Sequence, residues 1–200
     1  LNRNPDDAGL KHYVDLMKTG QIDEKSLDVK FKESAEYLLS HPVKIQPNTP
    51  IDIVMKKEWN ERTKINPLFV IATGHSKNED DFWNSGIDDC ESILGIDTER
   101  FQKIIENKHP SKMNILEIGS GIGRILIPMR KFFGSVTGID ISSEMVLLGQ
   151  KYVLDIPNCS IVENNGVDLS QFPDNSFDFC YSFIVFQHIP EKQIVENYIK

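Results

Sequence analysis

Cysteine is scarce in this sequence, and its placement excludes two common kinds of site. The three cysteines, Cys90, Cys159 and Cys180, are far apart, and none of them has a C-x-x-C partner. Three widely spaced cysteines predict neither a disulfide framework nor a zinc site. We therefore expect buried free thiols and no bound metal.

Long apolar runs and clusters of basic residues are missing as well. No run reaches the roughly 18 apolar residues that a membrane-spanning helix needs, and no secretory pattern opens the chain. The 22 Lys and Arg residues are interspersed with 30 Asp and Glu residues, for a net charge of −8. Nucleic-acid binding needs a clustered basic surface, so this composition argues against it. We expect a cytoplasmic protein without membrane insertion that acts on a small molecule.

An initial methionine is also lacking. The chain begins at Leu1 and ends at Lys200, inside a predicted helix. We therefore expect it to be an excerpt of a longer protein.

The most informative stretch runs from Asn114 to Asp140. It opens with an apolar run that has the length and branching of a buried strand, and it then breaks at Gly119, Gly121 and Gly123. A helix and a second strand follow, and the second strand ends in Asp140. This order predicts a strand, a turn that holds a nucleotide, a helix and an acidic residue placed to bind a ribose.

The first forty residues predict a separate helical domain. Two amphipathic helices fit residues 1–41, and the proline-rich stretch 42–50 reads as a linker. The segment resembles the DUF4214 family of small helical domains in Arg3-Asn4-Pro5-Asp6, Gly9-Leu10, Tyr13, Gly20, Phe31 and Ser34-Ala35-Glu36-Tyr37. The front of the family pattern is missing, and the resemblance implies an accessory or scaffolding role without a defined reaction.

Residues 51–110 predict a helical leader, with helices near 51–63, 78–94 and 98–107. Trp59, Phe69, Phe82 and Trp83 lie in this leader. Either a lid over a cofactor pocket or ordinary core packing explains these aromatics.

Residues 111–200 alternate strands with helices, which predicts an α/β fold with a Rossmann-like parallel sheet. The expected strands are 115–118, 136–139, 159–162 and 177–183. The expected helices are 122–133 and 142–154, with a third starting near Pro190. Because Pro128 lies inside the first of them, a lost hydrogen bond or a kink is expected there.

Two features separate this glycine turn from a dinucleotide site. The dinucleotide pattern G-x-G-x-x-G, counted from Gly119, requires glycine where this chain has Arg124. Glu117 lies beside the turn, and a carboxylate is unfavourable next to a pyrophosphate. It suits a ligand that carries an ammonium group and a sulfonium.

The motifs downstream strengthen this interpretation. After E-x-G-x-G-x-G and the acidic strand end come Asn164-Asn165-Gly166-Val167-Asp168 and then P-D-N-S-F-D at 173–178. In these four motifs, over residues 112–190, the chain resembles the class I S-adenosylmethionine-dependent methyltransferases. The resemblance implies S-adenosylmethionine as the cofactor and an unidentified small-molecule or glycan acceptor.

The same resemblance assigns the cofactor site residue by residue. Glu117 and the turn Gly119, Ser120 and Gly121 would hold the methionine moiety, and Asp140 with Ile141 would hold the ribose side. Asn165 and Gly166 would contact the adenine, or Asp168 would do so in another register. For Asp140 alone, a helix N-cap role before Ser142 is the alternative.

Ser182 and Phe183 complete the expected cofactor site, with Phe183 near the methyl group. The acceptor should lie beyond the fourth strand, within residues 182–190. His188 is the candidate general base, with loop geometry as its alternative role. Two other functions remain open at this point. The fold could bind its cofactor without turnover, as a scaffold, or the chain could be an NAD-dependent oxidoreductase.

Overall fold

The computed structural model describes residues 18–20, 48–72, 78–96, 98–106 and 108–200. The chain forms two compact units, Leu1–Lys44 and Ile45–Lys200. Only residues 18–20 of the first unit are described, so the DUF4214-like segment lies almost wholly outside the described residues. The sheet and its helices belong to the second unit.

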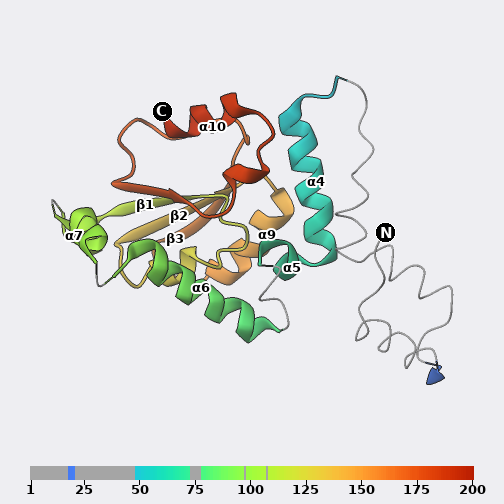
Figure 1. Ribbon diagram of the computed structural model, residues 1–200, viewed down its shortest axis with the longest axis horizontal. Helices are drawn as coiled ribbons and strands as arrows, with labels where there is room; N and C mark the ends of the chain where they lie inside the picture. Colours follow the sequence, from blue (N-terminus) through green and yellow to red (C-terminus); the bar gives the residue numbers. More distant parts are fainter. Residues whose placement is uncertain (1–17, 21–47, 73–77, 97, 107) are drawn as a thin grey trace. The chain divides into compact units, whose positions relative to one another are not determined.

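A four-stranded parallel sheet is the centre of this unit (Figure 1). Its strands are β1 (Asn114–Ile118), β2 (Ser135–Asp140), β3 (Cys159–Glu163) and β4 (Phe179–Ser182), in the order β3-β2-β1-β4. In the register, Ile118 pairs with Ile139 on one side and with Ser182 on the other. The chain adds β2 and β3 on one side of β1 and then crosses over to add β4 on the other side. Parallel sheets of this kind bind ligands at the carboxyl ends of the strands where the order reverses, here β1 and β4.

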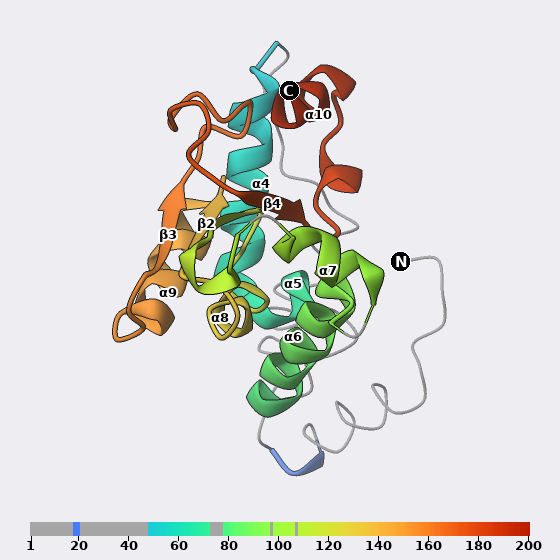
Figure 2. The ribbon, with the colours of Figure 1, turned by 90° about the vertical axis from the view of Figure 1, so that its left-hand side faces the viewer.

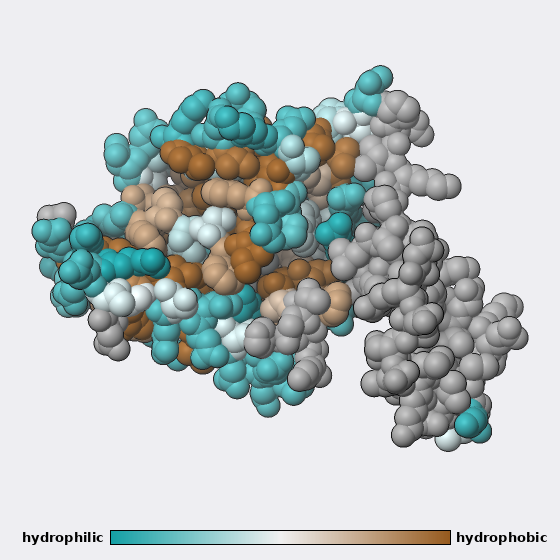
Figure 3. Space-filling view, in the orientation of Figure 1, coloured by the Kyte–Doolittle hydropathy of each residue, from teal (hydrophilic) through white to brown (hydrophobic). Residues whose placement is uncertain are grey.

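Helices cover both faces of the sheet, which explains why β1 is apolar on both sides. One face packs on α6 (Glu79–Leu94), α8 (Leu126–Met129) and α9 (Ser143–Val153), and its core includes Ile115 and Val136. The other face packs on α10 (Lys192–Ile199) through Leu116 and Ile139. The view along the sheet shows α10 on the side opposite to α6 and α8 (Figure 2). Hydrophilic residues cover the outside of α10, and hydrophobic ones lie between it and the strands (Figure 3).

In its described residues the leader contributes three further helices, and the described part of the unit also contains two short 3-10 helices. The helices are α4 (Ile51–Ile65), α5 (Pro67–Ile71) and α7 (Glu99–Ile105). The 3-10 helices are η2 (Pro110–Lys112) and η3 (Phe186–His188). Asn78 begins α6 as predicted, because its side-chain oxygen accepts from Asp81 N at 2.7 Å.

The helix expected over residues 122–133 is much shorter than predicted. The chain passes through consecutive turns after Gly121, and only Leu126–Met129 is α-helical. Pro128 thus stands in the first turn of α8, where its missing N–H needs no acceptor within the helix. The expected kink is avoided because the helix begins only two residues before the proline.

The thiols are free, as predicted, but they are not all buried. Cys90 is buried, Cys159 is partly buried and Cys180 on β4 is exposed. Within the described residues, no helix is long and apolar enough to cross a membrane.

Gly86 on α6 gives a direct test of how the leader packs on the glycine turn. A Cβ at Gly86 would lie 2.2 Å from the carbonyl oxygen of Arg124, which is backbone and cannot move aside. Although alanine favours a helix interior by about 1 kcal/mol, we expect Gly86→Ala to destabilise the fold by about 2–3 kcal/mol through overpacking. Urea unfolding measures this change. Ser92→Ala, on the exposed side of α6, is the control and should stay within about 0.5 kcal/mol of wild type.

Candidate functional site

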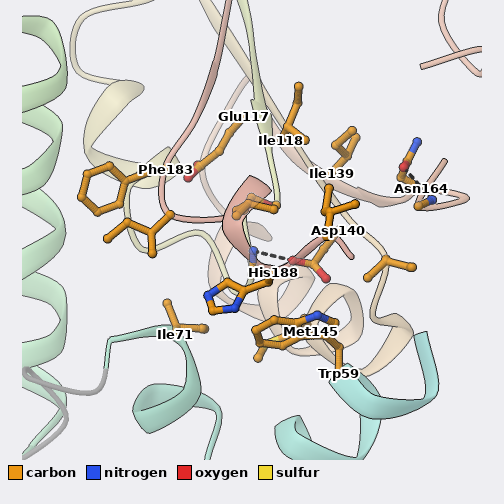
Figure 4. Close-up of a pocket in the computed structure, with 18 of the residues that line it drawn as sticks. Trp59, Ile71, Glu117, Ile118, Ile139, Asp140, Met145, Asn164, Phe183 and His188 are labelled. Atoms are coloured by element: carbon orange, nitrogen blue, oxygen red, sulfur yellow. Dashed lines mark hydrogen bonds between the residues drawn. The ribbon is translucent and has the colours of Figure 1, made fainter. Parts of the chain in front are cut away.

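A pocket opens at the carboxyl ends of β1 and β2, beside the start of the segment after β4 (Figure 4). The strand ends and the glycine turn contribute Glu117, Ile118, Gly119, Ser120, Gly121, Arg124, Ile125, Ile139, Asp140 and Ile141. Other segments contribute Met55, Trp59, Val70, Ile71, Met145, Asn164, Gly166, Phe183, Ile184, Val185, His188, Ile189 and Tyr198. The lining is mostly apolar with a few convergent polar groups, as in small-molecule sites.

The glycine turn needs its glycines for conformation and for space. Gly119 and Gly121 have φ of +76° and +54°, in the left-handed region that favours glycine. A Cβ at Gly119 would lie 2.4 Å from Val185, and one at Gly121 would lie 3.0 Å from Ile71. The turn is therefore in close contact with the segment after β4 and with α5, and a ligand can approach its backbone.

Glu117 is a buried carboxyl group at the end of β1, with 3% of its surface exposed. Burial raises its pKa to about 8, although a hydrogen bond from Tyr181 and the charge of Arg124 both act to lower it. The hydroxyl of Tyr181, on the neighbouring strand β4, donates to Oε2 of Glu117 at 3.0 Å. A cation placed in the pocket would favour the ionised form of this group.

Asp140 joins the glycine turn to the start of α9. Its Oδ2 accepts from Gly121 N at 2.9 Å, and its Oδ1 accepts from Ser142 N at 2.8 Å. Burial raises its pKa to about 6. The N-cap of α9 is Ser142, whose Oγ accepts from Met145 N, so Asp140 is not the cap. Its carboxylate oxygens keep further lone pairs for a ligand.

Arg124 is a buried cation in the same pocket. Its Nη1 donates to Asp89 Oδ2 at 2.7 Å and to Ser85 Oγ at 2.9 Å, both on α6. Its Nε is buried and has no hydrogen-bond partner in the described part of the chain. A buried donor without a partner costs about 1–3 kcal/mol, so this group requires an explanation.

At the other end of the pocket, Ile141 and Gly166 lie against each other, because a Cβ on Gly166 would meet Ile141 Cδ1 at 2.2 Å. Asn164 lines the pocket here, while Asn165 lies outside the lining. The side chain of Asn165 is turned to its own loop, where it donates to Asp168 and accepts from Val167 N. Asp168 is likewise outside the lining.

The segment after β4 carries a strained residue. Ile184 has φ of +58°, a left-handed conformation that is rare for a β-branched residue. Its side chain is 59% exposed. Phe183 lines the pocket, whereas Ser182 does not, because its hydroxyl donates to Ile118 O. His188 also lines the pocket, and partial burial and the charge of Arg62 hold its pKa below the ordinary value.

Helix α4 closes one side of the pocket. Trp59 contacts His188 edge-on, with ring centroids 5.6 Å apart, and both rings lie near Asp140 in Figure 4. Asn60 Oδ1 accepts from Ser142 Oγ at 2.7 Å, which ties α4 to the start of α9. The other leader aromatics differ: Phe82 is fully buried in the core, and Trp83 packs against Tyr152.

The structure brings nine of the eleven predicted site residues together around this pocket. They are Glu117, Gly119, Ser120, Gly121, Asp140, Ile141, Gly166, Phe183 and His188. Sequence reasoning did not assign Arg124, Tyr181, Asn164 or Tyr198 to the site. The position of Arg124 directly after the last glycine of the turn could have indicated that it lies in the site. Among the described residues, no group of His, Cys, Asp or Glu side chains could hold a metal ion.

Comparison with known proteins agrees with this fold. Residues 116–198 match the family described as "Methyltransferase domain". The phosphoethanolamine N-methyltransferase of Plasmodium falciparum is 34% identical over 93 residues, which cover 46% of this chain and 34% of that protein. The chain spans about a third of the length of the curated relatives it matches.

Two solved structures share the fold. The phosphoethanolamine N-methyltransferase 1 of Haemonchus contortus, in complex with phosphoethanolamine and S-adenosylhomocysteine, is 15% identical with a TM-score of 0.56. That match covers 77% of this chain and 30% of the other. The magnesium protoporphyrin IX methyltransferase of Synechocystis PCC 6803, with bound S-adenosylmethionine, is 17% identical with a TM-score of 0.53, covering 75% and 69%. The predicted fold class, a Rossmann-like α/β fold of the class I methyltransferase type, is confirmed.

Proposed function

We propose that this chain binds S-adenosylmethionine and belongs to an enzyme that transfers the methyl group to a small-molecule or glycan acceptor. The observation that carries the proposal is one pocket that combines the glycine turn, buried Glu117 and Asp140 at the carboxyl ends of β1 and β2. The match of residues 116–198 to a methyltransferase domain supports it.

The residues present fit this cofactor. Glu117 is a buried carboxyl that an ammonium group would ionise, and the turn from Gly119 to Gly121 lines the pocket. Asp140 can accept from ribose hydroxyls with its remaining lone pairs. The apolar side chains of Ile139, Ile141 and Met145 line the pocket and can pack against the adenine ring. When bound, the cofactor would supply an electrophilic methyl group on a sulfonium.

The protein's own part in such a transfer is to orient donor and acceptor and to exclude water. Phe183, Trp59 and the strained Ile184 line the side of the pocket formed by α4 and the segment after β4. We assign the acceptor to this side. Among the described residues on this side, His188 is the candidate to take a proton from a hydroxyl or an ammonium, because its lowered pKa keeps it neutral near pH 7.

The names of the relatives support a small-molecule acceptor but do not identify it. The Plasmodium relative is a phosphoethanolamine N-methyltransferase, whereas the Synechocystis protein that shares the fold is a magnesium protoporphyrin IX methyltransferase. These acceptors differ in size and charge, so similarity alone does not select one. Of the two explanations for the leader aromatics, we propose the lid role for Trp59, which lines the pocket, and core packing for Phe82. For the DUF4214-like segment we propose an accessory role.

The proposal is tested with labelled S-adenosylmethionine and a panel of phosphoethanolamine, other amines, hydroxyl compounds and sugars. We expect S-adenosylhomocysteine as product and label on one class of acceptor. Cofactor binding without label transfer to any acceptor would instead favour a scaffold that has lost turnover. Failure to bind the cofactor at all would overturn the proposal.

A variant of His188 tests its role as base. For an acceptor that must lose a proton, His188→Gln should lower kcat/KM by about 10²-fold or more, since general bases contribute about 10²–10⁴. The affinity for S-adenosylhomocysteine should change less than about threefold, because cofactor contacts remain. His109→Gln is the matched control, since His109 lies outside the pocket and bonds to Ser111. A wild-type rate and pH profile in His188→Gln would assign this histidine to loop geometry alone.

A further inference from the structure

Arg124 is a buried charged group in the pocket that the proposed function leaves without a role. It is 5% exposed, and its Nη1 is already engaged by Asp89 and Ser85. Its Nε has no partner in the described part of the chain, although it is buried. The hydrogen bonds to α6 therefore account for Nη1 of the guanidinium but give no partner to Nε.

The position of Arg124 indicates which part of a ligand it would meet. Its Cζ lies 5.9 Å from the ring centre of Phe183, and its charge acts on Glu117. Figure 4 shows Glu117 beside Phe183, on the side of the pocket away from Asn164. One end of the pocket thus holds a carboxyl and a guanidinium. Each is anchored by a partner of its own, Tyr181 for Glu117 and Asp89 for Arg124.

We propose that Arg124 binds the carboxylate of the amino-acid end of the donor and selects for its presence. This inference rests on the proposed function. An α-amino acid carries an ammonium and a carboxylate on one carbon, and Glu117 and Arg124 offer a group of opposite charge to each. A guanidinium forms charge-assisted hydrogen bonds with a carboxylate, and Arg124 lines the pocket together with Glu117.

A purely structural Arg124 makes a different prediction. If it only fastens α6 to the glycine turn, its loss weakens every ligand of the pocket to the same extent. If it binds the carboxylate, its loss weakens only ligands that have one. The ratio of two affinities in the same variant separates these cases, since general damage to the pocket cancels in the ratio.

The experiment measures the Kd of S-adenosylhomocysteine and of its decarboxylated analogue by calorimetry. Wild type should prefer S-adenosylhomocysteine by about 10–100-fold, as expected for a buried charged pair. Arg124→Met should reduce this preference to less than about threefold, and Arg124→Lys should keep part of it. Asp89→Asn is the matched control, because it removes the ion pair to α6 and leaves the guanidinium in place. Circular dichroism checks that each variant is folded.

Each outcome bears on a separate claim. If wild type fails to bind S-adenosylhomocysteine, the proposed function itself is wrong. If wild type binds both ligands equally, or if Arg124→Met keeps the full preference, the cofactor site stands and the role of Arg124 is overturned. Asp89→Asn should keep most of the preference, because its amide oxygen can still accept from Arg124 Nη1.

Discussion

Asp140→Asn is expected to weaken the binding of S-adenosylhomocysteine by about 100-fold. The carboxylate keeps lone pairs for two ribose hydroxyls while it accepts from Gly121 N and Ser142 N. An amide has one oxygen, so it cannot serve both backbone donors and both hydroxyls. A hydrogen bond to a charged group contributes about 1.5–3 kcal/mol, and the loss of one or two gives this change. Calorimetry with purified protein measures it directly.

The control for Asp140 is an acidic residue of the same chemistry outside the pocket. Asp174→Asn meets that condition, because Asp174 is exposed and does not line the pocket. It should bind S-adenosylhomocysteine as wild type does. Equal affinity in Asp140→Asn and wild type would remove Asp140 from the cofactor site and leave it only its role of joining the turn to α9.

Cofactor binding should release a proton, because Glu117 is largely protonated at pH 7 in the free protein. Its pKa there is about 8, and the ammonium group of the cofactor would lower it in the complex. The Kd for S-adenosylhomocysteine should therefore fall by roughly 10–30-fold from pH 6.5 to pH 8.5. Calorimetry in buffers of different ionisation enthalpy counts the proton. Asp140 contributes little to this change in Kd between pH 6.5 and pH 8.5, because its pKa is about 6 and it is mostly ionised there.

Glu117→Gln separates binding from stability. A pKa raised from 4.5 to about 8 means that the folded state binds more protons than the unfolded state between these values, so this group lowers stability as pH rises. We expect Glu117→Gln to be more stable than wild type at pH 8.5, by a few kcal/mol as an order of magnitude, and to lose this advantage near pH 5. It should bind the cofactor weakly and without proton release. A variant whose pH dependence of binding matched wild type would exclude Glu117 as the titrating group.

The order of strands and helices could be predicted because each strand of the sheet has a strong local pattern. Ile115, Leu116 and Ile118 form a short apolar run that a glycine turn ends, and β2 and β3 are short segments with β-branched residues that each end in an acidic residue. The prediction of a helix over residues 122–133 was wrong, because tertiary contacts override the helical periodicity of this segment. The approach of Gly86 to the backbone of Arg124, and the position of Pro128, keep that segment in turns.

The site was predictable where backbone geometry determines it. Glu117 and Asp140 end adjacent strands, so the sheet brings them to one edge whatever the side chains do. Asn164 and Asn165 are adjacent and chemically identical, and only the turn decides which one lines the pocket. Tyr181 and Trp59 reach the site from β4 and α4, and no local pattern tells which of several aromatics will do so.

Whether the pocket holds S-adenosylmethionine is decided by a titration of the wild-type protein at pH 8 with S-adenosylhomocysteine and, separately, with NAD. We expect one site for S-adenosylhomocysteine with a Kd on the order of 10 μM, and no binding of NAD at about 1 mM. Binding of NAD in place of S-adenosylhomocysteine would show that the pocket is not a methyl-donor site and would favour an oxidoreductase.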